Sequence, residues 1–365
     1  MAQHAIACGH SQTAAAAESI LIEGGTAADA AIAAALAAAV AEPVLAGLLG
    51  GGFAVVAGQG RPQILDFFVQ TPRQRSADID FRSVFADFGT TTQEFHIGAG
   101  AIAAPGVASG LMELHRRAAR MPFTALTEPA IRLAKEGVRI TGYQAQLGRI
   151  VQPILMASPE SRALSCDASG PLPEGAVYYN PDFADVLETY GREGPRFVME
   201  GEVGAALIDI AREGGHLSSE DLSAYEPVWR SLLTIHRGPF EIALNPAPSL
   251  GGTLIALSLE LTGTASGPVD LARVFQAVSA CRAEAADDPV RLSAPDLVDH
   301  YRATLSRHAV STRGTTQISV VDGNGNAVSL TLSNGEGCGL IVPGTGIMPN
   351  NMLGEEDLVP GGWQS

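Results

Sequence analysis

A candidate nucleophile lies in the segment 314–322, Gly-Thr-Thr-Gln-Ile-Ser-Val-Val-Asp, where two threonines follow a glycine. If the peptide bond before a threonine is cut, that threonine can attack with its hydroxyl and use its own α-amino group as the base. Thr315, the first of the pair, is the candidate for this role. A threonine pair at the start of a strand is equally typical of β-propensity alone. The segment by itself therefore leaves both interpretations open.

The elements that must position Thr315 form a predicted β-hairpin. Residues 315–321 alternate between polar and apolar side chains, which is the period of a strand. The sequence Asp-Gly-Asn-Gly-Asn at 322–326 favours a tight turn, and residues 327–333 return as the second strand. The polar stretch 300–314 before the hairpin predicts an exposed linker that cleavage can reach.

Two helices rich in small residues are predicted near the N-terminus, at 11–23 and 26–41. Thr26 is the expected N-cap of the second helix, and Asp29 three residues later is close to a capping-box arrangement. Glu42, followed by a proline, ends that helix.

The glycine-rich run 47–52 leads into a strand at 54–57, and its glycines permit close backbone approach. Residues 63–70 are expected to pair with that strand. The remaining elements predicted from the sequence are helices at 107–120, 126–136, 182–190, 208–213, 253–261 and 271–287, and strands at 229–235 and 240–244.

The overall composition excludes several functional classes. The length of 365 residues suggests two domains or one large α/β unit, and the 46% hydrophobic content is enough for a substantial core. The net charge of −16, with no basic run, argues against nucleic acid and anionic membranes as partners. The N-terminus shows neither the basic region nor the apolar run of a signal peptide, which predicts a cytoplasmic protein.

The sequence predicts neither a metal nor a cofactor. The four cysteines form no CxxC pair, and the eight histidines show no ligand spacing. The segment 98–103 matches the dinucleotide pattern GxGxxA, but Pro105 interrupts the position where the helix of that motif would run.

Several short motifs, in chain order, resemble the gamma-glutamyltransferase (gamma-glutamyltranspeptidase) family. They are Glu42-Pro43 with the glycine run, Ala104-Pro105-Gly106, Pro-Ala-Ile-Arg-Leu-Ala-Lys-Glu-Gly at 129–137, Gly214-Gly215 with Asp221 to Tyr225, Arg237-Gly238, Pro248 to Gly252, the Thr315 hairpin, Val342 to Ile347, and Asn350-Asn351. The resemblance implies an α/β (α+β type) protein with the four-layer αββα fold of N-terminal nucleophile hydrolases.

The resemblance also implies self-cleavage between Gly314 and Thr315. Residues 1–314 would be large-subunit-like, and residues 315–365 would be a short small-subunit-like region with an incomplete second sheet. The mature Thr315 would attack a side-chain amide, form an acyl-enzyme, and pass the acyl group to water or an amine. Ser333 falls where the family carries a threonine that hydrogen-bonds the amine of the nucleophile.

The substrate-binding positions depart from the family pattern. Phe68 stands where the family has an arginine that clamps the glutamyl α-carboxylate, a contact that an aromatic ring cannot make. Glu355 and Glu356 are the candidates for holding the substrate α-amine, and Asn334 and Asn351 join the predicted substrate-binding set. We therefore expect a small amide or peptide substrate other than glutathione.

A second interpretation also follows from the resemblance. The paired serines and the Gly-Gly turn that supply the family's oxyanion hole have no counterpart after residue 357. The alternatives are a truncated, uncleaved or inactive homologue that acts as a binding or interaction protein, self-association, or a complementing second chain.

Overall fold

A computed structural model of the chain describes residues 4–58, 60–89, 92–262, 267–285, 288–292, 296, 300 and 315–354. The chain forms two compact units, and each is described by itself. The larger unit comprises residues 1–59, 65–228 and 314–365, and the smaller comprises 60–64 and 229–313. The predicted linker lies outside the described residues from 301 onward. The predicted division into residues 1–314 and 315–365 describes where the chain would be cleaved. The two compact units do not test it, so it stays a prediction.

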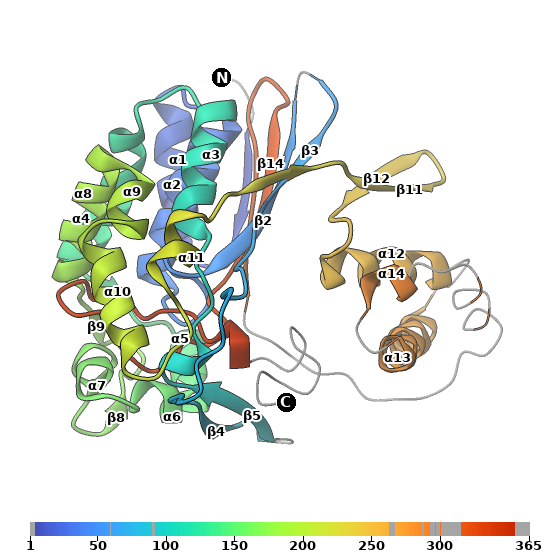
Figure 1. The fold of residues 1–365 in the computed structure, drawn as a ribbon. Coiled ribbons are helices and arrows are strands. Elements are labelled where there is room, and N and C mark those ends of the chain that lie inside the picture. Colours follow the sequence, from blue (N-terminus) through green and yellow to red (C-terminus); the bar gives the residue numbers. More distant parts are fainter. Residues whose placement is uncertain are drawn as a thin grey trace. The chain divides into compact units, whose positions relative to one another are not determined.

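A six-stranded sheet organises the larger unit (Figure 1). Its order is β1 (Ala5–Cys8), β13 (Thr316–Val321), β14 (Ala327–Ser333), β2 (Gly51–Ala57), β3 (Gln63–Phe67) and β10 (Val228–Arg230). The first four of these strands pair antiparallel with their neighbours. The predicted hairpin is confirmed as β13 and β14, in the middle of this sheet. Strand β1 was not predicted, because four residues are too few to show a periodic pattern.

Helix α2 (Ala27–Ala41) packs directly on the hairpin strands β13 and β14 and is buried along its whole length. Its alanines bring the helix backbone close to the sheet, since their side chains are short. The capping box of Thr26 and Asp29 forms as predicted. In Figure 1, α1 (Ser11–Ile22) and α3 (Val107–Ala118) lie with α2 beside the sheet, and α4 (Phe123–Glu136) and α8 (Pro181–Glu193) lie farther out.

The segment 138–223 holds more regular structure than the sequence suggested. Its Pro, Gly, Ser and Asp residues disguise short helices, because such residues cap and start helices as well as forming loops. The elements are β6 (Val138–Arg139), α5 (Gly142–Ile150), α6 (Gln152–Leu155), α7 (Pro159–Ser165), β7 (Cys166–Asp167), β8 (Gly170–Pro171), β9 (Val177–Tyr178), α9 (Pro195–Met199), α10 (Glu202–Arg212) and α11 (Ser219–Ser223). A further hairpin, β4 (Arg82–Asp87) and β5 (Thr92–Ile97), contributes Phe95 and Ile97 to a core cluster with residues of α6.

Among its described residues, the smaller unit contains a hairpin and three helices. Strands β11 (Leu233–Arg237) and β12 (Phe240–Leu244) pair antiparallel. Helices α12 (Leu250–Thr262), α13 (Pro268–Glu284) and α14 (Pro289–Leu292) share a core that includes Leu257, Val274 and Cys281. The strand predicted at 229–235 is divided, because β10 ends at Arg230 and β11 begins at Leu233.

Asp322 ties the turn of the β13–β14 hairpin to the start of α2. Its buried carboxylate accepts hydrogen bonds from the backbone N–H groups of Ala27 (3.1 Å), Asn324 (2.9 Å) and Asn326 (3.0 Å), and from the Asn326 side chain (2.8 Å). Burial raises the pKa of Asp322, but these hydrogen bonds outweigh it and leave the pKa below its ordinary value. The charged form therefore stabilises the hairpin.

We expect this stabilisation to be lost in acid. A carboxyl group with a depressed folded pKa contributes stability above its unfolded pKa, about 3.9, and loses it as the pH falls through the folded value. Asp322→Asn should lower the midpoint of thermal unfolding at pH 7, and the gap to the wild type should narrow below about pH 4. The exposed Asp78→Asn serves as the control. A gap that stays constant down to pH 2 would contradict the assignment.

Candidate active site

Thr315 lies immediately before β13 and is exposed. The hairpin register pairs Thr316 with Leu332, so its continuation by one residue places Thr315 opposite Ser333. The two residues that the sequence predicted for the nucleophile and for the partner of its amine thus flank the last pair of the ladder, Thr316 and Leu332, and their roles stay predictions. Gly314, the other half of the predicted cleavage site, lies outside the described residues.

The face of the hairpin that carries Thr315 and Ser333 is polar. Alternation places Gln317 and Thr331 on the same face, opposite the one that packs on α2. The Gln317 side chain donates to Ser329 Oγ at 2.9 Å and accepts from the Thr331 hydroxyl. Gln317 and Ser329 are both exposed. The candidate nucleophile therefore lies at the end of a hydrogen-bonded polar surface rather than in the apolar core.

A buried carboxylate, Glu42, anchors the start of β13. It is 5% exposed and accepts one hydroxyl on each oxygen, from Thr13 at 2.8 Å and from Thr316 at 2.8 Å. A Cβ at Gly9 would lie 2.6 Å from Glu42 Oε2 and 3.1 Å from Thr316 Oγ1, so only glycine fits beside this group. Sequence reasoning assigned Glu42 only to a helix end and a family motif, because nothing local shows which distant side chain a carboxylate will meet.

The glycine run permits the close approach that the sequence predicted. A Cβ at Gly50 would lie 2.3 Å from the carbonyl oxygen of Ser333, and one at Gly52 would lie 2.3 Å from that of Thr331. Gly51 pairs with Ser333 in the ladder between β2 and β14. The Ser333 hydroxyl accepts a hydrogen bond from the N–H of Gly335 at 3.1 Å. A larger residue at Gly50 or Gly52 would therefore push against β14, the strand that carries Ser333.

Asn351 holds the loop that follows Ser333. Its side-chain oxygen accepts from the N–H groups of Glu336 (2.9 Å) and Gly337 (3.2 Å), and its amide donates to the His96 carbonyl at 3.2 Å. These contacts show a structural role, while substrate binding by Asn351 stays a prediction. Glu355 and Glu356 lie outside the described residues.

Asn334 is buried beside the glycine run. Its amide donates to the Met348 carbonyl at 3.2 Å, and its Oδ1 has no hydrogen-bond partner among the described residues. An ideal Cβ at Gly47 would lie 3.0 Å from that oxygen. Asn334 therefore presents an unused acceptor, which agrees with its predicted place in the substrate-binding set without testing it.

Phe68 is held in an apolar cluster. Its ring stacks on Phe53, with centroids 5.4 Å apart and planes 14° apart, and it packs against a group that contains Met352 and Leu353. The nearby Arg73 forms an ion pair with Glu220 at 2.6 Å and is 52% exposed. The position predicted to clamp a carboxylate is therefore occupied by an aromatic surface.

Comparison with known proteins decides the family. The sequence profile described as Gamma-glutamyltranspeptidase matches residues 13–361, nearly the whole chain. The chain belongs to the gamma-glutamyltranspeptidase family. The resemblance drawn from the short motifs is thereby confirmed, and membership supports an amide hydrolase or transferase.

Curated relatives of this gamma-glutamyltranspeptidase family member include acylases and glutathione hydrolases. The Acylase ACY 1 proenzyme of Pseudomonas sp. strain V22 is 31% identical, over 96% of this chain and 69% of its own length. The glutathione hydrolase proenzyme of Pseudomonas aeruginosa is 27% identical, over 98% of this chain and 69% of its own length.

Solved structures confirm the fold class of this gamma-glutamyltranspeptidase family member. A cephalosporin acylase from Bacillus halodurans aligns with a TM-score of 0.80 at 23% identity, covering 95% of this chain and 69% of its own. A gamma-glutamyltranspeptidase from Pseudomonas nitroreducens aligns with a TM-score of 0.68 at 24% identity, covering 84% of this chain and 95% of its own. The predicted N-terminal nucleophile hydrolase fold is therefore correct.

Cys338, in the loop after Ser333, is not poised to act as a competing nucleophile. Cys338 is fully buried in the loop after Ser333, and burial raises its pKa to about 12, so it stays a thiol at neutral pH. Within the part of the chain that the structure describes, no group of three or more His, Cys, Asp or Glu side chains could hold a metal ion.

No helix among the described segments is both long enough and apolar enough to cross a bilayer.

Proposed function

We propose that this protein is an N-terminal threonine hydrolase or acyltransferase that cuts its own chain before Thr315 and acts on an amide other than glutathione. The observation that carries the proposal is the exposed Thr315 opposite Ser333, at the end of a strand anchored by Glu42. The substrate is a small amide or peptide.

Maturation begins with the Thr315 hydroxyl. Its oxygen attacks the carbonyl carbon of Gly314, the peptide C–N bond breaks, and the hydroxyl proton passes to the nitrogen, which becomes the free amine of Thr315. Water then hydrolyses the resulting ester, which releases the Gly314 carboxylate and restores the hydroxyl. The new amine is the base for the later reaction, and we expect the Ser333 hydroxyl to hydrogen-bond it.

Acyl transfer uses the same hydroxyl. The Thr315 amine takes the hydroxyl proton as the oxygen attacks a substrate amide, and the leaving amine departs with a proton. The acyl-enzyme ester then passes its acyl group to water or to an acceptor amine. The anchor from Glu42 to Thr316 supports this reaction, since it fixes the backbone that carries the nucleophile.

The donor that fits best carries an uncharged acyl group. Phe68 offers an aromatic surface where the family is expected to carry the arginine that clamps a glutamyl α-carboxylate, and Arg73 is paired with Glu220. The acylases among the relatives are consistent with such a donor.

We expect the mature protein to hydrolyse γ-glutamyl-p-nitroanilide at least ~10-fold more slowly than butyryl-p-nitroanilide. The missing charge-assisted contact corresponds to about 1.5–3 kcal/mol of binding free energy. Release of p-nitroaniline measures both reactions, and Phe68→Leu, which adds no charge, should keep the preference. Faster turnover of the γ-glutamyl substrate by the wild type would contradict the proposed donor class.

A second candidate is an uncleaved binding protein, or a site that another chain completes. The exposed polar face that carries Gln317 and Ser329 favours this alternative, because a second sheet covers the corresponding face in a four-layer fold. Intact mass of the purified protein separates the two candidates, since only the first yields a fragment that begins at Thr315.

A further inference from the structure

A cavity of about 430 Å³ lies within the larger unit, away from the exposed polar face of the hairpin. Its walls come from residues 9–11, the end of α2 and the following loop at 39–48, helix α5, residues 164–183, and the loop 336–348. Thr315, Ser333 and Phe68 are not among its lining residues. The cavity therefore excludes the proposed nucleophile and its partner, and it shares Glu42 with the anchor of β13.

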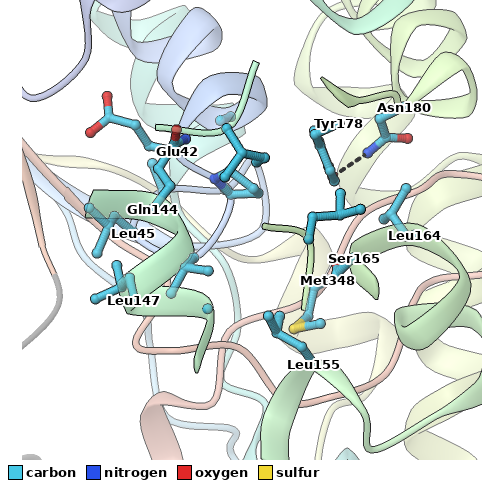
Figure 2. A pocket seen from close by; sticks show the side chains of 18 of the residues that line it. Glu42, Leu45, Gln144, Leu147, Leu155, Leu164, Ser165, Tyr178, Asn180 and Met348 are labelled. Carbon is cyan, nitrogen blue, oxygen red and sulfur yellow. Dashed lines mark hydrogen bonds between the residues drawn. The ribbon is translucent and has the colours of Figure 1, made fainter. Parts of the chain in front are cut away.

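Most of the lining is apolar (Figure 2). Side chains from several elements surround the space, among them Leu45, Leu147, Leu155, Leu164, Ile347 and Met348. A cavity of this size and composition, with few polar groups, is typical of a site for a small apolar molecule.

His10 supplies a hydrogen-bond donor to this lining. It is 8% exposed, and its Nδ1 accepts the backbone N–H of Gln12 at 3.1 Å. Burial lowers the pKa of His10 by more than the neighbouring Glu42 and Gln144 raise it, so the ring is neutral at pH 7. With Nδ1 as the acceptor, the proton of the neutral ring is on Nε2.

No acceptor lies in hydrogen-bonding geometry with the His10 Nε2–H among the described residues, although the Gln144 side chain lies close enough to the ring to raise its pKa. The adjacent Gln144 directs its amide to the Ala41 carbonyl and its oxygen to Thr141. A buried donor without a partner loses its hydration and gains nothing in return. A ligand oxygen that accepts this hydrogen would remove that cost.

The charges of the lining exclude anions. Glu42 and Glu336 line the cavity, and both are more than 90% buried. The lining contains no lysine or arginine. Each Glu42 oxygen already accepts a hydroxyl, from Thr13 or Thr316. At another wall, the Tyr178 hydroxyl is engaged by Asn180 at 3.0 Å (Figure 2).

We propose that this cavity binds an uncharged molecule with an apolar body and a carbonyl oxygen that accepts a hydrogen bond from His10 Nε2. The apolar lining holds the body, the imidazole orients the carbonyl, and the two buried glutamates reject a carboxylate. This site does not depend on cleavage before Thr315.

The first test uses an uncharged fluorescent naphthyl ketone, 6-propionyl-2-(dimethylamino)naphthalene, on the full chain. We expect saturable binding of one molecule per chain with blue-shifted emission. 2-Acetylnaphthalene should displace it, while 2-naphthoate, which has the same ring system and a charge, should bind at least ~10-fold more weakly. Equal or tighter binding of 2-naphthoate, or of the cation 2-(aminomethyl)naphthalene, would overturn the proposed ligand class.

The second test uses variants. Asparagine is a good N-cap, so His10→Asn keeps the cap of α1 but removes the Nε2 donor, and should weaken binding of the ketone about 10-fold. Leu147→Trp fills the cavity and should abolish binding. Gln146→Trp is the matched control, because it adds the same ring at an exposed position of α5 and should bind as the wild type does.

Two further variants make the outcome decisive. Leu164→Trp fills the cavity from another element. If circular dichroism shows that Leu147→Trp is misfolded, ketone binding is measured in Leu164→Trp instead, and it should be abolished there too. Thr315→Ala should bind the ketone normally, which separates this site from the proposed reaction. Wild-type affinity in a folded cavity-filling variant, or in His10→Asn, would overturn the proposal.

Discussion

Thr315→Ala should leave the protein as one uncleaved chain and reduce amide hydrolysis at least ~10³-fold. The substitution removes the oxygen that attacks Gly314 and later the substrate, so maturation and turnover are lost together. On a denaturing gel and by intact mass, the wild type should separate into residues 1–314 and 315–365. Thr315→Ser keeps the hydroxyl and should cleave more slowly.

The matched control for this prediction is Thr331→Ala. The Thr331 hydroxyl lies on the same face of the hairpin and donates a hydrogen bond to Gln317. Removing this hydroxyl disturbs the polar face but leaves the nucleophile in place. It should still cleave. Both fragments from Thr315→Ala would show that the scissile bond lies elsewhere, and a wild-type chain that never cleaves would favour the binding-protein alternative.

Thr316→Val should slow cleavage about 10- to 100-fold. The valine keeps the shape of the side chain but removes the hydrogen bond to Glu42 Oε2, which leaves a buried carboxylate oxygen unsatisfied at a cost of about 1–3 kcal/mol. The start of β13 then loses its anchor, and the neighbouring Thr315 loses its fixed position. The appearance of the fragment that begins at Thr315, followed over time, measures the effect.

Thr13→Val provides the comparison that separates positioning from stability. Thr13 donates to the other oxygen of the same carboxylate at the same 2.8 Å, so it should cost similar thermal stability but leave Thr316 anchored. Thr13→Val should therefore cleave nearly as fast as the wild type, and Thr316→Ser should restore cleavage. If Thr13→Val and Thr316→Val slowed cleavage equally, Glu42 would have only a structural role.

Local signals in the sequence were sufficient for the hairpin and for α2. Alternation and a dense turn sequence identified β13 and β14, and Thr26 with Asp29 identified the start of the helix. These features depend on neighbours within a few residues, which is why they can be read without a structure. The short helices α5 to α7 were missed, since four to nine residues with many cap formers give little periodicity.

The ordered set of motifs by itself determined the family, the fold class and the choice of Thr315, because the order of motifs along a chain is a property of sequence alone. Only the tertiary structure decided what surrounds that threonine. It set Thr315 and Ser333 beside the last pair of the hairpin ladder, brought Glu42 across 274 positions to Thr316, and placed His10 in the lining of a cavity. The physical reason is that hydrogen bonds and charges act through space, and their partners here are distant in the chain.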